Sequence, residues 1–99
     1  MALENLVGLD VSDDASYQAY REAMTPILTR YGGGFRYDFR VGEVLKSESD
    51  ARINRLFIIH FPDRGAKDGF FADPEYAAVR ARFFAPAVKA VTILAEYER

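Results

Sequence analysis

The 99-residue chain has no cysteine, no tryptophan and a single histidine, His60. The lack of thiols excludes disulfides, zinc fingers, iron–sulfur clusters and thiol catalysis. One histidine cannot form a two-histidine metal site, and the sequence has no Walker, Rossmann or G-x-S-x-G pattern. We therefore expect no metal and no cofactor. Any catalysis would be acid–base chemistry by side chains, or would depend on a ligand that the sequence does not reveal.

A strong charge of one sign and long apolar runs are also missing. The formal net charge is −2 and the sequence pI is about 5.3, which disfavours a nucleic-acid partner or an anionic membrane surface. No apolar run approaches the length of a membrane span, and the first residues lack the basic and then apolar layout of a signal peptide. We expect a cytoplasmic protein that contacts neither nucleic acid nor membrane.

The amino-acid composition is typical of a globular protein and predicts one domain covering residues 1–99. Hydrophobic residues make up 49% of the chain, and eight phenylalanines and six tyrosines supply large side chains for a core. A chain of this length is enough for one domain and too short for two.

Apolar spacing and capping signals predict the order β-α-β-β-α-β. Strands are expected over 2–11, 35–41, 55–61 and 88–97, and helices after Asp13, Asp63 and Asp73. This order is that of the α+β, ferredoxin-like fold, with a four-stranded antiparallel sheet and helices on one face. Gly42 is a candidate bulge at the end of the second strand.

The first helix carries one apolar stripe, which comprises Tyr17, Tyr20, Met24, Ile27, Leu28 and Tyr31. We assign its tyrosines to the core, and Glu75–Tyr76 to the start of a later helix. Pro26 lies inside the stripe, which predicts a kink or break near Glu22 because proline removes a backbone donor. Gly32–Gly34 are expected to end the helix.

The predicted sheet is apolar on both faces, although the helices can cover only one. In the third strand, Phe57 and Ile59 point to one face and Leu56 and Ile58 to the other. An exposed apolar sheet of this size is rare on monomers, and two-fold homodimers are the commonest assembly. We therefore predict a homodimer in which two sheets pack face to face and form a barrel with a central cavity.

If even-numbered residues of the second strand lie opposite even-numbered residues of the third, several polar side chains share this second face, namely Arg36, Asp38, Arg40 and His60. An apolar space with a few converging polar groups is typical of a ligand pocket. His60 and Asp38 are the candidate catalytic residues, since histidine titrates near neutral pH. Arg36, Arg40 and Tyr37 are the candidate ligand-binding residues, because guanidinium groups bind anions.

Structural roles for the same residues are open alternatives. His60 can serve as a hydrogen-bonded residue at a strand end or at the dimer seam. Arg36 and Arg40 can form salt bridges between subunits, with the carboxylates of Asp38, Glu43 or Glu48 as partners.

Four sequence motifs resemble those of a known family. They are Tyr17-x-x-Tyr20, Tyr31–Gly32–Gly33, Phe61–Pro62, and Asp73–Pro74–Glu75–Tyr76 followed by Arg80. In order and spacing they resemble the family catalogued as domain of unknown function 1330, and the resemblance covers almost the whole chain. It implies a ferredoxin-like fold in the dimeric α+β barrel superfamily and no established reaction. The segments 34–40 and 45–48 depart from the pattern of the family.

These observations support three hypotheses of function. The first is a homodimeric small-molecule-binding protein. This hypothesis includes the case of a cofactor-independent enzyme that acts on a small organic or aromatic acid in the inter-sheet cavity. The second is a non-catalytic assembly or regulatory module. The third, RNA stacking on Phe57 and Phe61, is disfavoured by the acidic pI and by the absence of the sequence signature of RNA-binding sheets.

Overall fold

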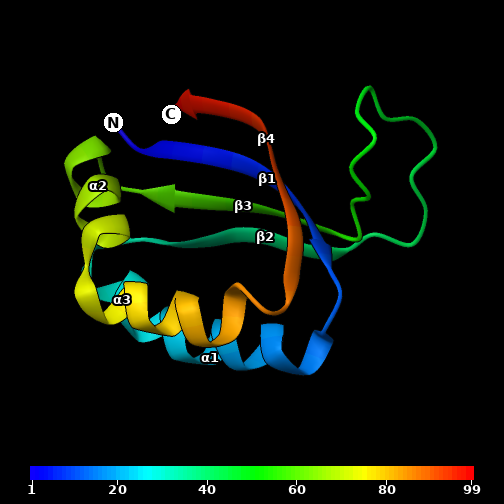
Figure 1. Cartoon of the computed structure of the whole chain (residues 1–99). Coiled ribbons are helices and arrows are strands. Elements are labelled where there is room, and N and C mark those ends of the chain that lie inside the picture. Colours follow the sequence, from blue (N-terminus) through cyan, green and yellow to red (C-terminus); the bar gives the residue numbers. More distant parts are fainter.

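Alternating and capped segments of the sequence form one sheet and one helical layer in the computed structural model, which describes residues 1–99 (Figure 1). The elements, in chain order, are β1 (Leu3–Val11), α1 (Asp14–Arg30), β2 (Gly34–Arg40), β3 (Arg55–Phe61), α2 (Arg64–Ala72), α3 (Pro74–Val79), the π-helical turn η1 (Arg80–Phe84) and β4 (Val88–Glu98). The predicted order β-α-β-β-α-β is confirmed.

The four strands form one antiparallel sheet in the order β2-β3-β1-β4. The helices lie together on one face of this sheet, and the other face carries none (Figure 1). This arrangement is the predicted ferredoxin-like fold.

Helix α1 begins and ends at the predicted residues. Asp13 accepts a hydrogen bond from the backbone N–H of Ser16 as N-cap, and Gly32 adopts a φ of 75° just beyond the helix. The predicted break near Glu22 is wrong, since α1 is continuous from Asp14 to Arg30 with Pro26 inside it. Pro26 has no N–H to donate to the carbonyl of Glu22. Both residues face solvent, so water can bind this carbonyl. No helix of the fold has the length and apolar character needed to cross a membrane.

The core lies between the sheet and the helices. From the sheet, Leu9, Ile59 and Phe61 are almost fully buried. The helical layer contributes Tyr17, Tyr20, Met24, Ile27, Leu28, Phe70, Tyr76 and Phe84. The predicted apolar stripe of α1 therefore packs against the sheet.

Strand β2 contains a bulge at Arg36 that the alternating sequence pattern does not predict. Phe35 lies opposite Ile59, but the next paired residue, Tyr37, lies opposite Ile58, so that Arg36 is the extra residue. The expected bulge at Gly42 is wrong, because β2 ends at Arg40 and Gly42 lies in the following loop.

The bulge reverses the faces of the second half of β2. Asp38 lies opposite Phe57 and Arg40 opposite Arg55, which places both on the helix-covered face. Tyr37 and Phe39 lie on the open face instead. The predicted placement of Asp38 and Arg40 beside Leu56 and Ile58 is therefore wrong, since one inserted residue moves every following side chain to the other face.

The open face of the sheet is apolar, as predicted. Leu6, Leu56 and Ile58 form its centre, and Tyr37 and Phe39 add two stacked rings whose centroids are 5.7 Å apart. Tyr37 is 57% exposed and Phe39 52% exposed. Leu6, Leu56 and Ile58 are half-buried, and the five side chains together form what we call the open-face patch.

Candidate functional site

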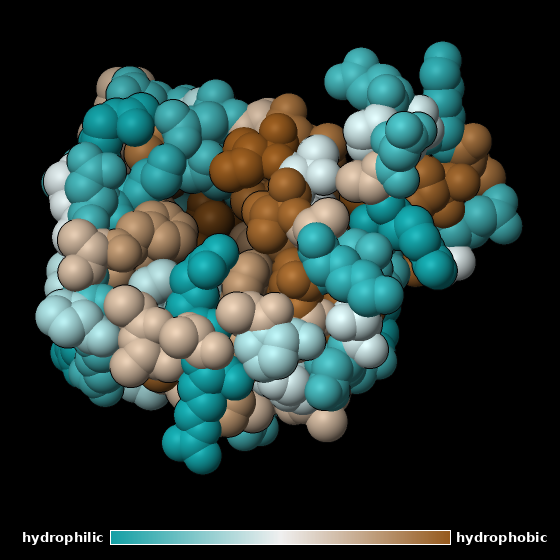
Figure 2. Space-filling view, in the orientation of Figure 1, coloured by the Kyte–Doolittle hydropathy of each residue, from teal (hydrophilic) through white to brown (hydrophobic).

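A cavity of about 160 Å³ lies between the helices and the sheet, on the covered face. Hydrophobic residues make up 14 of the 17 that line it, and every strand and helix contributes to its wall. In Figure 2 apolar side chains gather over β4, beside a hollow between this strand and the helices. Val91 and Ile93 of β4 line the cavity and are about half exposed, so the cavity opens at this edge of the sheet.

Two tyrosines from different elements form a hydroxyl pair in this cavity. Tyr20 projects from the stripe of α1, and Tyr76 from α3, which begins where the Asp73 side chain accepts hydrogen bonds from two backbone N–H groups. Their hydroxyl oxygens are 2.8 Å apart. Because each phenol has one proton and only one is shared, the pair keeps a second O–H that can donate to a ligand.

Burial keeps the phenols of the cavity protonated. It raises the pKa of Tyr20 and of Tyr76 above the ordinary value of 10, although the Arg80 guanidinium acts in the opposite direction on both. Burial likewise raises the pKa of Tyr17 to about 12. At neutral pH these side chains are therefore hydrogen-bond donors and not bases.

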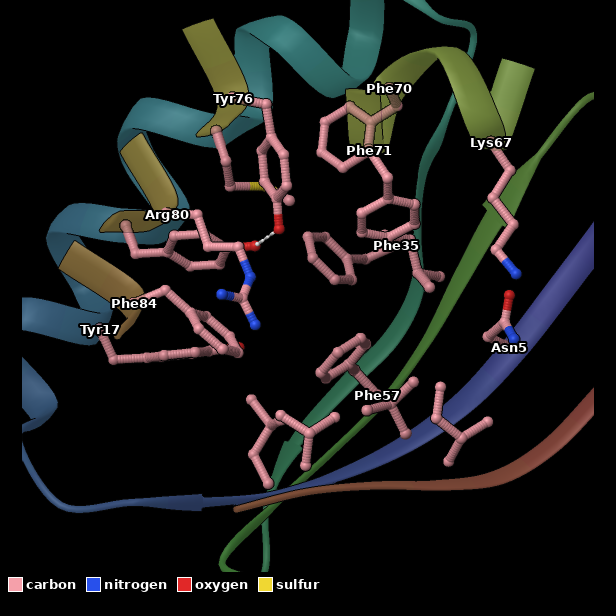
Figure 3. A pocket seen from close by; sticks show the side chains of 17 residues that line it. Asn5, Tyr17, Phe35, Phe57, Lys67, Phe70, Phe71, Tyr76, Arg80 and Phe84 are labelled. Atoms are coloured by element: carbon pink, nitrogen blue, oxygen red, sulfur yellow. Dashed lines mark hydrogen bonds between the residues drawn. The ribbon is translucent and has the colours of Figure 1, made fainter. Parts of the chain in front are cut away.

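Arg80 supplies a positive charge beside the hydroxyl pair. It begins the π-helical turn η1, and its guanidinium carbon lies 4.8 Å from the centre of the Phe84 ring. No carboxylate of the chain forms an ion pair with Arg80. Figure 3 shows the guanidinium pointing into the cavity next to the dashed line that joins the two tyrosines. The cation is thus available to an anionic ligand.

A second polar group lies on the other side of the cavity and centres on Glu96 of β4. Its carboxylate accepts hydrogen bonds from Asn5 Nδ2 at 2.8 Å, from Lys67 Nζ at 2.6 Å and from the Arg64 guanidinium at 3.0 Å. Hydrogen bonds from Lys67, Asn5 and Arg64 lower the pKa of Glu96 to about 2. Asn5 and Lys67 line the cavity, and Asn5 Oδ1 is buried without any hydrogen-bond partner.

The open face carries a different polar group at one end of the sheet. Glu4 is almost fully buried there, and it accepts hydrogen bonds from Arg36 Nε and, at 2.8 Å, from the Tyr97 hydroxyl. Burial raises the pKa of Glu4, but these hydrogen bonds and the charges of Arg36 and Arg99 hold it below the ordinary value. His60 lies directly opposite Glu4, and burial, together with the charge of Arg36, lowers its pKa.

The residues predicted to form one site are divided between the two faces of the sheet. His60, Arg36 and Tyr37 lie on the open face, whereas Asp38 and Arg40 lie on the helix-covered face. There the latter two form ion pairs, Asp38 with Arg21 at 2.8 Å and Arg40 with Asp14 at 3.3 Å. The two candidate catalytic residues, His60 and Asp38, therefore lie on opposite faces of the sheet, and both predicted arginines find carboxylate partners within the chain.

The sequence did not predict the polar residues of the cavity, although part of the signal was present. The motifs quoted for the family resemblance contain Tyr20, Tyr76 and Arg80, but the tyrosines were assigned to the core and to a helix start. The two tyrosines are core residues and cavity residues at once, because a core side chain beside a cavity also forms its wall. Nothing in the sequence pattern singles out Asn5 or Lys67.

Comparison with solved structures identifies the same fold in proteins of low sequence identity. A protein of unknown function from Rhodopseudomonas palustris is 18% identical, with a TM-score of 0.80 over 99% of this chain and 82% of that one. A dabb family protein with a ferredoxin-like fold from Mesorhizobium loti is 16% identical, with a TM-score of 0.68 over 99% and 96%. A dimeric ferredoxin-like protein of unknown function from Jannaschia sp. is 16% identical, with a TM-score of 0.61 over the whole of both chains.

The family to which the chain belongs follows from its sequence and agrees with this fold. Identities below 20% to the solved structures show the fold alone, and no curated protein matches the sequence. Residues 6–97 match the family described as a domain of unknown function, which confirms the resemblance carried by the four motifs. The chain therefore belongs to the family of the domain of unknown function DUF1330.

Proposed function

We propose that the protein is a homodimer whose protomers each bind a small, largely apolar carboxylic acid in the cavity between helices and sheet. The observation that carries this proposal is the guanidinium of Arg80, which points into an apolar cavity without a carboxylate partner. A guanidinium binds a carboxylate through two parallel hydrogen bonds. The spare proton of the Tyr20–Tyr76 pair can donate to the same carboxylate.

The size of the cavity limits the ligand to a single ring or a short chain. Its volume of about 160 Å³ is close to the roughly 150 Å³ of an apolar protein cavity that holds benzene. Sites for drug-sized ligands measure roughly 300–1,000 Å³. The ligand is therefore of the size of benzoate, with the carboxylate at Arg80 and the apolar body among the phenylalanine rings.

The residues of the cavity favour binding over acid–base catalysis. None of the lining residues is an aspartate, a glutamate or a histidine, and the phenols stay protonated at neutral pH. Glu96 is next to the cavity, but with a pKa of about 2 it is a very weak base. His60 and Glu4 lie on the opposite face of the sheet, away from the proposed ligand.

The open-face patch supports a second copy of this chain as its cover. Its exposed rings and aliphatic side chains are unfavourable in water, and an identical patch on a two-fold partner would bury both. Structural neighbours from Bacteroides fragilis, Jannaschia sp. and Thermobifida fusca are described as dimeric. In such a dimer the sheets face each other and the two ligand cavities lie on the outer sides.

Isothermal titration with benzoate tests the role of Arg80. We expect saturable binding of benzoate to the native protein. In the Arg80→Gln variant the affinity for benzoate should fall roughly tenfold to a hundredfold, since charge-assisted hydrogen bonds contribute about 1.5–3 kcal/mol. Arg82→Gln is the matched control. Arg82 also lies over a phenylalanine, at 4.9 Å from the Phe83 ring centre, and forms no ion pair, but it does not line the cavity.

Equal affinities for the two variants would contradict the assignment of the carboxylate to Arg80. Absence of binding of benzoate and of short-chain carboxylates to the native protein would leave the non-catalytic assembly module as the function of this chain.

A further inference from the structure

We infer that the ligand is a single-ring aromatic acid that carries a hydroxyl group on the part of the ring remote from the carboxylate, where Asn5 and Lys67 bind it. The inference rests on the proposed function, because Arg80 has to fix the carboxylate end. It adds the chemistry of the opposite end, which the proposal leaves open.

The cavity has polar groups at two ends and aromatic walls between them. Figure 3 shows Arg80 and the tyrosine hydroxyls on one side and Asn5 with Lys67 on the other. The rings of Phe35, Phe57 and Phe71 lie between these groups in the same view. A ligand that contacts both ends therefore has polar substituents on opposite parts of an apolar body.

The aromatic walls favour a flat ring as this body. Phe35 and Phe57 are in edge-to-face contact, with centroids 5.3 Å apart and an interplanar angle of 85°. Phe70 and Phe71 form a second such pair at 5.0 Å and 75°. Edges and faces of rings are thus both presented by the wall, and an added ring gains edge-to-face contacts that an aliphatic chain cannot make.

Asn5 Oδ1 provides a hydrogen-bond acceptor that the protein leaves unused. Asn5 is 4% exposed, and Oδ1 has no partner. The amide cannot reverse to avoid this, because Nδ2 donates to Glu96 Oε2 and a reversed amide would set two oxygens against each other. A buried acceptor without a donor is costly, so a ligand that brings a donor to this point gains affinity.

Lys67 distinguishes a hydroxyl from other donors. Its ammonium group has three N–H bonds, of which Glu96 accepts one, and it lies next to Asn5 in Figure 3. A hydroxyl can donate to Asn5 Oδ1 and accept from Lys67 at once. An aromatic amino group donates well but accepts poorly, and a second carboxylate would face both Asn5 Oδ1 and the carboxylate of Glu96.

Titration with matched acids tests this inference. We expect the better of 3-hydroxybenzoate and 4-hydroxybenzoate to bind about tenfold more tightly than benzoate. The affinity of 4-aminobenzoate should lie between that of this hydroxybenzoate and that of benzoate, and terephthalate should bind most weakly. In Lys67→Met the advantage of the hydroxyl, measured as the ratio of hydroxybenzoate affinity to benzoate affinity, is reduced. Arg64→Met is the matched control, because Arg64 also donates to Glu96 from α2 but does not line the cavity.

The Asn5→Leu variant removes the acceptor itself, and in it the hydroxybenzoates should bind no better than benzoate. Lys67→Met carries the test alone if Asn5→Leu does not fold. Equal affinities of the native protein for benzoate and both hydroxybenzoates would overturn the inference and leave the proposed function standing. If none of these acids binds, the proposed function falls as well.

Discussion

Among the glycines, Gly33 is the one at which the fold leaves least room for a side chain. A Cβ atom there would lie 2.5 Å from Leu28 Cδ1 and 3.0 Å from the backbone oxygen of His60. Leu28 is packed in the core and the His60 carbonyl belongs to β3, so neither can move freely. We expect Gly33→Ala to lower the free energy of unfolding by roughly 1–3 kcal/mol through overpacking, as measured by urea denaturation.

Gly42→Ala is the control for this prediction. A Cβ at Gly42 meets no atom within 4 Å, and we expect a change within about 0.5 kcal/mol, as for most surface positions. Equal destabilisation by the two substitutions would show that the contact at Gly33 is not responsible.

At the scale of elements, Glu96 connects β4 to α2 and β1. Its folded-state pKa of about 2 lies below the ordinary value of 4.5, so the carboxylate stabilises the fold fully above pH 4.5. This contribution is lost as the pH falls from 4.5 through 2, because the unfolded chain then binds a proton that the folded one does not. We expect urea denaturation midpoints of the native protein to fall over this range, and those of Glu96→Gln to be lower at pH 7 and to fall less steeply.

Glu98→Gln serves as the comparison, because Glu98 lies in the same strand, is exposed and forms no ion pair. The urea denaturation midpoints of Glu98→Gln should fall with decreasing pH as steeply as those of the native protein. The prediction is wrong if Glu96→Gln loses stability with pH as steeply as the native protein does.

At the scale of the whole molecule, the proposed function predicts separable roles for the two faces of the sheet, ligand binding on one and dimer formation on the other. We expect Phe39→Asp to convert the proposed dimer to a monomer in sedimentation experiments, because a charge in the open-face patch would be buried without a partner in the interface. Ala78→Asp introduces the same charge on the exposed surface of α3 and should leave the dimer intact.

The monomeric variant should still bind benzoate, since the cavity lies within one protomer on the opposite face of the sheet. A Phe39→Asp protein that remains dimeric at the same dilution would exclude the open-face patch as the interface. Loss of binding in a folded monomer would show that the partner completes the site.

Local chemistry made much of the fold predictable. The caps Asp13, Asp63 and Asp73 begin helices at the expected places, because each side chain accepts backbone N–H groups of its own first turn. The alternation in β3 predicted an apolar second face, since successive side chains of a strand point to opposite faces. These features depend on residues close in sequence.

The candidate site depended on contacts between distant residues and could not be predicted in the same way. The bulge at Arg36 placed Asp38 and Arg40 on the unexpected face, because alternation fixes relative faces only as far as the ladder is regular. Tyr20 and Tyr76 meet across 56 positions of sequence. The sequence by itself determined the elements, their order and the apolar character of both faces of the sheet. Only the tertiary structure decided which polar groups share a cavity, because a cavity is the space that packing leaves unfilled and no local pattern encodes it.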